Sequence, residues 1–220
     1  MLRTEVRTTN MRIAIKPGAD WSFDDTVLVR GPVPESFADD FADGDYTADP
    51  AWSVASGTWS VASNELTSTV AALNRYICQP DYDRADGLVS FSYVDREVDS
   101  SGEWACVYLR FADNANWLRI FINETMLRIQ QMLDNTVTNE ATASLSHTED
   151  QWYDIRAELD GDTVRVWRAE QGGTPELVLS AADLDVLTTT QLRLCIGANA
   201  DYAFDNFDIR VPDPEITTYE

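Results

Sequence analysis

The sequence is poor in basic residues and almost without lysine. Lys16 is the single lysine beside 15 arginines, and the 16 basic residues face 38 aspartates and glutamates, which gives a formal net charge of −22 over 220 residues. Recognition of a phosphate backbone needs a basic face on the protein. We therefore exclude nucleic acid as a partner.

Histidine, cysteine and long apolar runs are also scarce. The one histidine, His147, stands in a polar stretch and is expected in a surface loop, whereas Cys78, Cys106 and Cys195 stand in apolar stretches. Three cysteines without paired spacing give neither a disulfide framework nor a zinc site, so we expect reduced core thiols. No run approaches the ~20 apolar residues of a membrane helix, and the N-terminus lacks the apolar segment of a signal peptide. We expect synthesis in the cytoplasm without membrane insertion.

The acidic excess indicates a salt-rich environment. So many carboxylates strain a compact domain by self-repulsion in dilute buffer. In molar salt the Debye length falls to ~3 Å and most of that repulsion is screened. The lysine-poor, aspartate-rich composition resembles that of proteins from extreme halophiles, and an ordinary acidic protein is the alternative.

Alternation of apolar and polar residues with a period of two runs through most of the chain, and helical periodicity is nearly absent. This pattern predicts strands at 51–55, 58–63, 71–78, 87–94, 103–111, 116–123, 126–133, 137–145, 152–159, 163–169, 176–180, 190–198 and 203–211. So many short strands separated by turn residues are typical of a sandwich or barrel. We expect an all-β protein.

One short repeat is present. The pentapeptide WSVAS occurs at 52–56 and again at 59–63, with Gly57-Thr58 between the two copies. A period of seven is too short for a solenoid or propeller unit. Two matched strands around a glycine turn predict a β-hairpin.

The two ends of the chain differ from its body. Residues 1–36 contain extended stretches and the Pro-rich joint GPVPES, and their charges balance to zero, so the whole −22 belongs to 37–220. A neutral segment escapes the repulsion that keeps acidic bodies apart. We expect an extended N-terminal arm over 1–36 for assembly or anchoring, a body over 37–211 and a C-terminal tail over 212–220.

Several motifs resemble the LamG-like, concanavalin A-like lectin-glucanase jelly-roll domains. The segment at 36–68, SFADDFADGDYTADPAWSVASGTWSVASNELTS, is similar to the opening of these domains. The segment at 195–211, CIGANADYAFDNFDIRV, is similar to their final strand. Between them, VYLRFADNANWLRIFI and QWYDIRAELDGDTVRVWRAE resemble the central hairpin and the Trp-led hairpin that follows. The resemblance covers about 37–211 and implies a jelly-roll sandwich. It implies little about activity, because one fold carries many functions.

No catalytic motif is complete. Family 16 glycoside hydrolases share this fold and carry Glu-x-Asp-x-x-Glu on one strand, where two close carboxyls perform the chemistry. The nearest string here, from Glu97 to Glu103, is one residue too long and includes the loop sequence Ser-Ser-Gly. His147 has no nucleophile elbow to serve. We expect no enzymatic activity.

A structural calcium ion is a further expectation. Asp205 is in phase with Phe207, and Asp39 is in phase with Phe37, so both carboxylates are expected to face inward from the last and first strands. Related jelly rolls pair these strands and hold calcium nearby. An inward carboxylate needs a cation or hydrogen bonds, so we expect Asp39, Asp40 and Asp205 to hold calcium, with backbone N–H groups as the alternative.

The non-core face of the central strands combines arginines with large aromatics. On concanavalin A-like folds the concave sheet face commonly binds glycans, with aromatic planes on sugar rings and arginine donors on hydroxyls or carboxylates. The expected glycan-binding residues are Trp104, Tyr108, Arg110, Trp117, Arg119, Arg128, Arg156 and Trp167. The alternative is a face that the arm, a loop or a neighbouring subunit covers.

Together these features predict a structural protein of a haloarchaeal virus particle, such as a capsid turret, a capsid decoration or a tail-associated protein. The arm would bind other virion proteins, the chain would form a homo-oligomer, and the jelly roll would contact a host surface glycan or glycoprotein. One alternative is a haloarchaeal carbohydrate-binding module, and another is a family 16-like glycoside hydrolase.

Overall fold

The computed structural model describes residues 37–48, 50–69, 71–79, 85–97, 102–187 and 191–210. Within these ranges the chain forms β-strands and no helix, and hence nothing there that could cross a membrane as a long apolar helix. The expected N-terminal arm (1–36) and C-terminal tail (212–220) lie outside the described residues.

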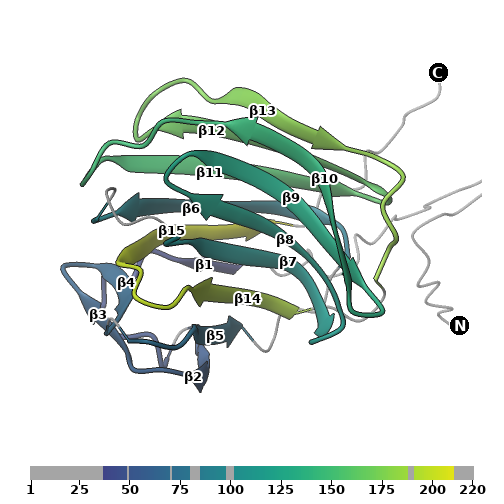
Figure 1. Ribbon diagram of the computed structural model, residues 1–220. Helices are drawn as coiled ribbons and strands as arrows, with labels where there is room; N and C mark the ends of the chain where they lie inside the picture. Colours follow the sequence, from purple (N-terminus) through teal and green to yellow (C-terminus); the bar gives the residue numbers. More distant parts are fainter. Residues whose placement is uncertain are drawn as a thin grey trace, which may run out of the picture. The chain divides into compact units, whose positions relative to one another are not determined.

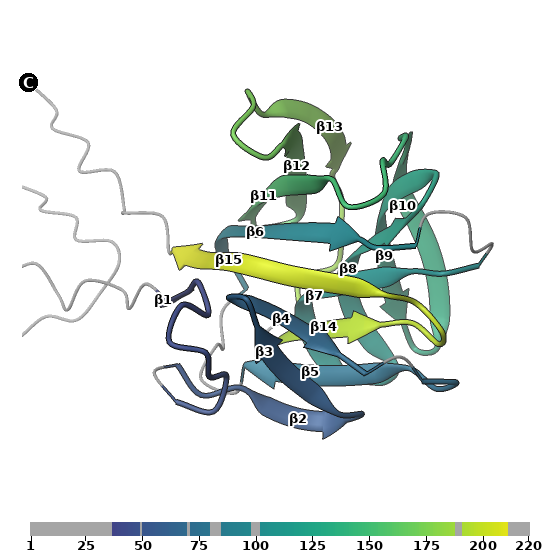
Figure 2. The same ribbon diagram turned by 90° about the vertical axis from the view of Figure 1, so that its left-hand side faces the viewer.

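The strands form two antiparallel sheets. Sheet A contains, in spatial order, β13 (Glu176–Ala181), β12 (Thr163–Glu170), β11 (Trp152–Asp160), β6 (Gly87–Asp95), β15 (Tyr202–Arg210), β4 (Glu65–Ser68) and β3 (Trp59–Ala62), and β1 (Phe37–Asp39) also pairs with β15. Sheet B contains β10 (Thr136–Ser144), β9 (Met126–Leu133), β8 (Asn116–Asn123), β7 (Ala105–Asp113), β14 (Gln191–Ile196), β5 (Arg75–Gln79) and β2 (Ser53–Ser56). Figures 1 and 2 show the sheets as two layers, and the expected all-β jelly-roll sandwich is confirmed.

Alternation along each strand sends one face of each sheet into a shared core. In β8, for example, Leu118, Ile120 and Ile122 are fully buried in that core, and the residues between them point to the other side of sheet B. Each expected strand overlaps one strand of the structure. The short strand β4 was not expected from the alternation, because four residues are too few for a period of two to stand out.

The predicted hairpin at the WSVAS repeat is wrong. The first copy, in β2, pairs with β5 in sheet B, and the second copy, in β3, pairs with β4 in sheet A. The chain therefore crosses from one layer to the other at Gly57, whose φ of +84° is left-handed. Trp52 and Trp59 are both buried in the core, and their burial between the sheets outweighs pairing of the two copies with each other.

His147 also differs from its expectation as a surface residue. It is buried, with Nε2 2.6 Å from the Tyr93 hydroxyl and Nδ1 3.0 Å from the Glu124 carbonyl oxygen. A carbonyl oxygen only accepts, so Nδ1 carries the proton and Nε2 accepts from Tyr93. Burial lowers the pKa of His147 below its ordinary value. The ring is a neutral structural residue that joins the β8–β9 turn to β6.

Candidate functional site

The outer face of sheet B carries a second hydrophobic layer outside the sandwich core. Its buried centre is formed by Cys106, Tyr108, Trp117 and Cys195, and its half-buried margin by Tyr76, Trp104, Phe111, Arg119, Phe121, Arg128, Met132 and Arg193. We refer to these twelve residues as the arginine face. Eleven of them come from β5, β14, β7, β8 and β9, which are neighbours in sheet B (Figure 1), and Trp104 directly precedes β7.

Arg119 lies at the centre of the arginine face among four aromatic rings. Its guanidinium carbon is 4.3 Å from the centre of the Trp117 ring and 5.4–5.5 Å from the rings of Trp104, Tyr108 and Phe121. Its Nε donates to Gln130 (2.9 Å) and its Nη1 to the Tyr108 hydroxyl (3.1 Å). Cation–π contacts and hydrogen bonds therefore hold this guanidinium inside the layer, where it fixes the rings around it.

Two of the three cysteines, Cys106 and Cys195, belong to this layer and not to the core between the sheets. Cys106 and Cys195 are buried, face each other across β7 and β14 and are free thiols. Burial opposes the Cys106 thiolate, but the hydrogen bond from Cys195 and the charge of Arg119 bring the pKa of Cys106 below its ordinary value. The thiols are free in the structure, and Cys106 and Cys195 lie in the outer layer of sheet B instead of the expected core.

Arg128 and Arg193 flank the centre and differ from Arg119 in their contacts. The guanidinium carbon of Arg193 is 4.3 Å from the Tyr76 ring centre and 4.5 Å from that of Phe111. That of Arg128 is 5.9 Å from the Phe121 ring centre. The Nε atom of each arginine is buried and has no hydrogen-bond partner among the described residues.

The arginine face is free of carboxylates. The outward positions of the four central strands carry Cys106, Tyr108 and Phe111 in β7, Trp117, Arg119, Phe121 and Asn123 in β8, Met126, Arg128, Gln130 and Met132 in β9, and Arg193 and Cys195 in β14. None of these is acidic, in a chain with 38 acidic residues. The surface is therefore locally cationic and aromatic on a protein of strongly negative net charge.

Five of the eight expected glycan-binding residues meet on this face, namely Trp104, Tyr108, Trp117, Arg119 and Arg128. Arg193, Tyr76 and Phe111 complete it and were missed. Alternation in LRLCI and RYICQ gives the outward direction of Arg193 and Tyr76, but only the strand order β5-β14-β7 shows that they join the same surface. Phe111 was expected to face the core, and the bulge before Arg110 turns it outward, opposite Trp117.

Arg110 was expected on this face, and the structure corrects that prediction. A bulge between Tyr108 and Arg110 puts Arg110 opposite Leu118, so its side chain is completely buried on the inner side of sheet B. It donates to the carbonyl oxygens of Ala85 and Gly161, both at 2.7 Å. Ala85 lies just before β6 and Gly161 in the β11–β12 turn, both next to strands of sheet A. Arg110 therefore joins the two layers and is not available to a ligand.

Arg156 and Trp167 were also assigned to the wrong surface. They face each other across β11 and β12 of sheet A, with the Arg156 guanidinium carbon 5.3 Å from the Trp167 ring centre. Arg156 is exposed and Trp167 half-buried. Their outward phase was predicted correctly, but alternation does not say which of the two sheets a strand joins.

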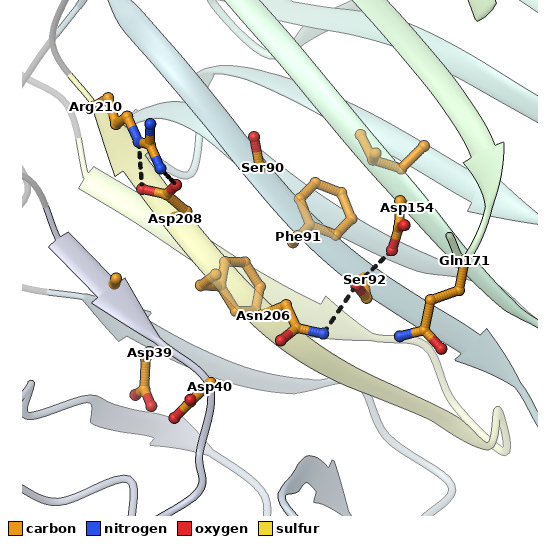
Figure 3. Close-up of a pocket in the computed structure, with 13 residues that line it drawn as sticks. Asp39, Asp40, Ser90, Phe91, Ser92, Asp154, Gln171, Asn206, Asp208 and Arg210 are labelled. Carbon is orange, nitrogen blue, oxygen red and sulfur yellow. Dashed lines mark hydrogen bonds and ion pairs between the residues drawn. The ribbon is translucent and has the colours of Figure 1, made fainter. Parts of the chain in front are cut away.

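The outer face of sheet A has an open depression of its own, shown in Figure 3. At its centre Asn206 Nδ2 donates to the Ser92 hydroxyl (3.2 Å), which donates to Asp154 (2.7 Å). At one end Arg210 pairs with Asp208. These polar groups satisfy one another, in contrast to the two unpaired arginines on sheet B, so we take the arginine face as the candidate binding site.

Of the acidic residues expected to hold calcium, Asp39 and Asp40 line this depression, whereas Asp205 does not. Asp39 faces inward as expected, but its carboxylate accepts the Phe41 N–H and the Trp52 indole N–H, both at 2.8 Å. Asp40 accepts the Ala42 N–H at 3.1 Å. Among the described residues no group of three or more His, Cys, Asp or Glu side chains is placed to hold a metal ion. Calcium binding stays a prediction.

Asp205 does not face inward, for a reason that the strand pattern conceals. A bulge follows it in β15, with Asn206 at a φ of +53°. The bulge lets Phe204 and Phe207 both enter the core, so Asp205 falls on the outer face opposite Ser92. Burial there, and next the nearby Asp40, raise the pKa of Asp205 to about 6.

The raised pKa makes Asp205 a destabilising residue at neutral pH. The folded chain keeps this proton up to about pH 6 and the unfolded chain loses it near the ordinary value of 3.8, so stability falls as the pH rises between these values. We expect Asp205→Asn to raise the Tm at pH 7 by about 2–4 °C, after allowance for partial exposure. The gain should largely vanish at pH 3.5, where Asp205 is mostly protonated in both the folded and the unfolded chain.

Thermal unfolding of both proteins at pH 7 and pH 3.5 measures this effect. Asp113→Asn is the matched control, because the Ala115 N–H and Asn116 lower the pKa of the exposed Asp113 instead of raising it. That control should give no gain at pH 7. A Tm unchanged or lowered by Asp205→Asn at pH 7 would contradict the sign derived above.

Comparison with known proteins shows the fold of this chain. No protein-family profile and no curated protein matches the sequence. Among solved structures, the carbohydrate-binding module CBM66 from Bacillus subtilis aligns with a TM-score of 0.59 and 15% identity over 71% of this chain and 92% of that chain. The exoplasmic/lumenal domain of VIP36, in a Ca²⁺/Man-bound form, aligns with 0.67 and 8% over 83% and 91%. Peanut lectin aligns with 0.61 and 9% over 80% and 96%.

These neighbours share the concanavalin A-like jelly roll of lectins and carbohydrate-binding modules, and the present chain has the same fold. The fold class implied by the sequence motifs is thus confirmed. Because the identities are so low, the comparison extends to the fold alone, and function has to be argued from the surface.

Proposed function

We propose that the chain is a non-enzymatic carbohydrate-binding protein that holds its ligand on the arginine face. One observation carries the proposal. Half-buried aromatic rings and arginines without acidic partners share one carboxylate-free sheet surface, on a sandwich whose neighbours include a carbohydrate-binding module and a lectin.

The surface suits the two kinds of contact that sugars make. Trp104 and Phe121 are stacked, with ring centres 5.6 Å apart and an interplanar angle of 28°, and both remain partly exposed. Such planes cover the apolar faces of pyranose rings. Arg128 and Arg193 supply forked N–H donors at the two sides. Tyr108 and Trp117 lie beneath, and we assign them to support of the exposed rings.

The same surface argues for binding without hydrolysis. Glycoside hydrolysis uses two carboxyl groups on either side of the scissile bond. The outward positions of β7, β8, β9 and β14 supply none. The Glu97–Glu103 segment, which carries the nearest approach to a hydrolase motif, includes residues 98–101 outside the described part of the chain. We expect no oligosaccharide hydrolysis by the wild-type chain, and hence no difference between it and a Glu97→Gln, Glu103→Gln double variant.

The test is direct binding by the full chain in molar KCl, with mannotriose, xylohexaose and hexagalacturonic acid as probes in isothermal titration calorimetry. We expect binding of at least one probe. Trp104→Ala should weaken it about tenfold, since an aromatic contact contributes roughly 1.4 kcal/mol and that free energy corresponds to a factor of ten. Trp104→Phe should retain most of the affinity.

Trp167→Ala is the matched control, because Trp167 is likewise half-buried beside an arginine but lies on sheet A. It should leave the affinity unchanged. Equal losses in the two tryptophan variants would place the ligand elsewhere, and absence of binding to all three probes would count against carbohydrate binding.

The finer expectation, a virion protein of a haloarchaeal virus, stays a prediction that concerns mainly residues 1–36. If the arm drives assembly, the full chain should form a defined homo-oligomer in molar KCl, and a chain that begins at Ser36 should be monomeric. Light scattering after size exclusion measures both masses. Two well-folded monomers would mean that the arm has no role in self-assembly.

A further inference from the structure

The three arginines of the arginine face have no carboxylate partner among the described residues, whereas four arginines elsewhere in the described part of the chain have one. Ion pairs among the described residues join Arg96, Arg110, Arg165 and Arg210 to carboxylates. No such pair includes Arg119, Arg128 or Arg193. The difference is not a shortage of acids, because the chain has 38 of them. It results from a surface on which acidic residues are absent.

Arg128 and Arg193 have a second peculiarity. Their Nε atoms are buried without a hydrogen-bond partner among the described residues, and their guanidinium groups lie against aromatic rings. A buried donor without an acceptor costs free energy, and such a donor in a native structure calls for an explanation, such as an ordered water, an ion or a ligand. By contrast Arg119, between them, already donates to Gln130 and Tyr108.

The acceptor that fits such a donor is an anion. A guanidinium presents parallel N–H groups that match the two oxygens of a carboxylate or sulfate, and a charged hydrogen bond of this kind is about twice as strong as a neutral one. A neutral sugar hydroxyl fills one donor and leaves the charge without a counter-ion. The rings beside Arg128 and Arg193 hold the guanidinium planes. The Nη groups are not among the buried unpartnered atoms of the described residues, so they are the donors that a ligand would meet first.

The two arginines lie too far apart to share one acid group. Arg193 is on β14 and Arg128 on β9, with β7 and β8 between them. Three interstrand steps of about 4.8 Å separate them by roughly 14 Å across the sheet. Across the strands, Arg193 is aligned with Tyr108 and Arg119. Arg128 is aligned with Phe121 and Cys106, which are two residues further along β8 and two residues back along β7. The path between the two arginines therefore crosses the aromatic centre diagonally.

We infer that the ligand of the arginine face is an acidic glycan, an oligosaccharide with at least two anionic groups that Arg128 and Arg193 bind while its sugar rings cover the aromatic side chains between them. The inference rests on the proposed carbohydrate binding and adds the chemical class of the ligand. Carboxylated and sulfated glycans present the same chemistry to a guanidinium, and the experiment separates them.

The experiment compares hexagalacturonic acid with its fully methyl-esterified form, which has the same rings without charge, and adds dextran sulfate against dextran. Titration uses the full chain in molar KCl. We expect the acidic form of at least one pair to bind roughly a hundredfold more tightly than its neutral counterpart, and Arg128→Gln and Arg193→Gln each to lose about tenfold for that acidic form.

Arg156→Gln, which removes an exposed arginine beside a tryptophan on sheet A, is the control and should bind like the wild type. If only hexagalacturonic acid binds more tightly than its neutral form, the ligand is a carboxylated glycan. If only dextran sulfate does, the ligand is a sulfated glycan. Equal affinity for charged and neutral forms would overturn the inference and leave carbohydrate binding intact. Acid-selective binding that survives both Arg→Gln changes would overturn the assignment of these two arginines. No binding to any of the four probes would count against the proposed function as well.

Discussion

Replacement of Gly57 by alanine is expected to lower the free energy of unfolding by about 2–5 kcal/mol. Gly57 is where the chain crosses between the sheets, and its φ of +84° strains any side chain. A Cβ atom there would lie 2.3 Å from Arg75 Cγ. Arg75 cannot withdraw, because it is buried and donates to Ser68 Oγ (2.8 Å) and the Ala200 carbonyl oxygen (2.5 Å). Backbone strain and overpacking therefore add.

Urea unfolding in molar KCl measures the loss, and Gly44→Ala is the control. Gly44 has a similar φ of +78°, but nothing lies within 4 Å of a Cβ placed there. Its replacement should show the backbone strain alone, about 1 kcal/mol. Similar losses at the two glycines would mean that the contact with Arg75 adds nothing to the cost.

Arg110→Met is expected to cost about 2–5 kcal/mol of stability without a specific effect on ligand affinity. The substitution leaves the carbonyl oxygens of Ala85 and Gly161 without their charged donor at the end of the sandwich, and each buried acceptor that loses its partner costs roughly 1–3 kcal/mol. Asp86 contributes less, because about half of its side chain is exposed.

Arg128→Met separates this structural role from the binding role. Arg128 has no hydrogen bond among the described residues, so its removal should change stability by less than about 1 kcal/mol. Urea unfolding and calorimetry on the same preparations test both halves of the prediction. Arg110→Met should be unstable but bind when folded, and Arg128→Met should be stable but bind weakly. A reversed pattern would place Arg110 on the binding surface after all.

These two arginines show where inference from the sequence is reliable and where it fails. In β8, strict alternation gave both the core residues Leu118, Ile120 and Ile122 and the outward Arg119, because a regular pleat sends successive side chains to opposite faces. In β7 the same reasoning failed at Arg110, since one extra residue in the strand reverses the phase of all that follow.

The same limit applies at the final strand. Asp205 was expected inward because it alternates with Phe207, but the bulge at Asn206 brings Phe204 and Phe207 into the core together. Asparagine tolerates the left-handed conformation that such a bulge uses. However, nothing in the local sequence AFDNFDI distinguishes a bulged strand from a regular one. The bulge forms because the burial of both phenylalanines stabilises the fold more than an uninterrupted ladder of hydrogen bonds in β15 would.

The sequence by itself determined the all-β class, the positions of the strands and the burial of most apolar side chains, because these follow from a local period of two. It also showed an unusual acidity and a set of outward arginines and aromatics. Only the tertiary structure decided which outward residues share a surface. The order β5-β14-β7-β8-β9 brings Arg193 and Arg128 onto one carboxylate-free face, and it places Arg156 and Trp167 on the opposite sheet. Strand order depends on long-range packing between segments distant in the sequence, and a local pattern contains no information about it.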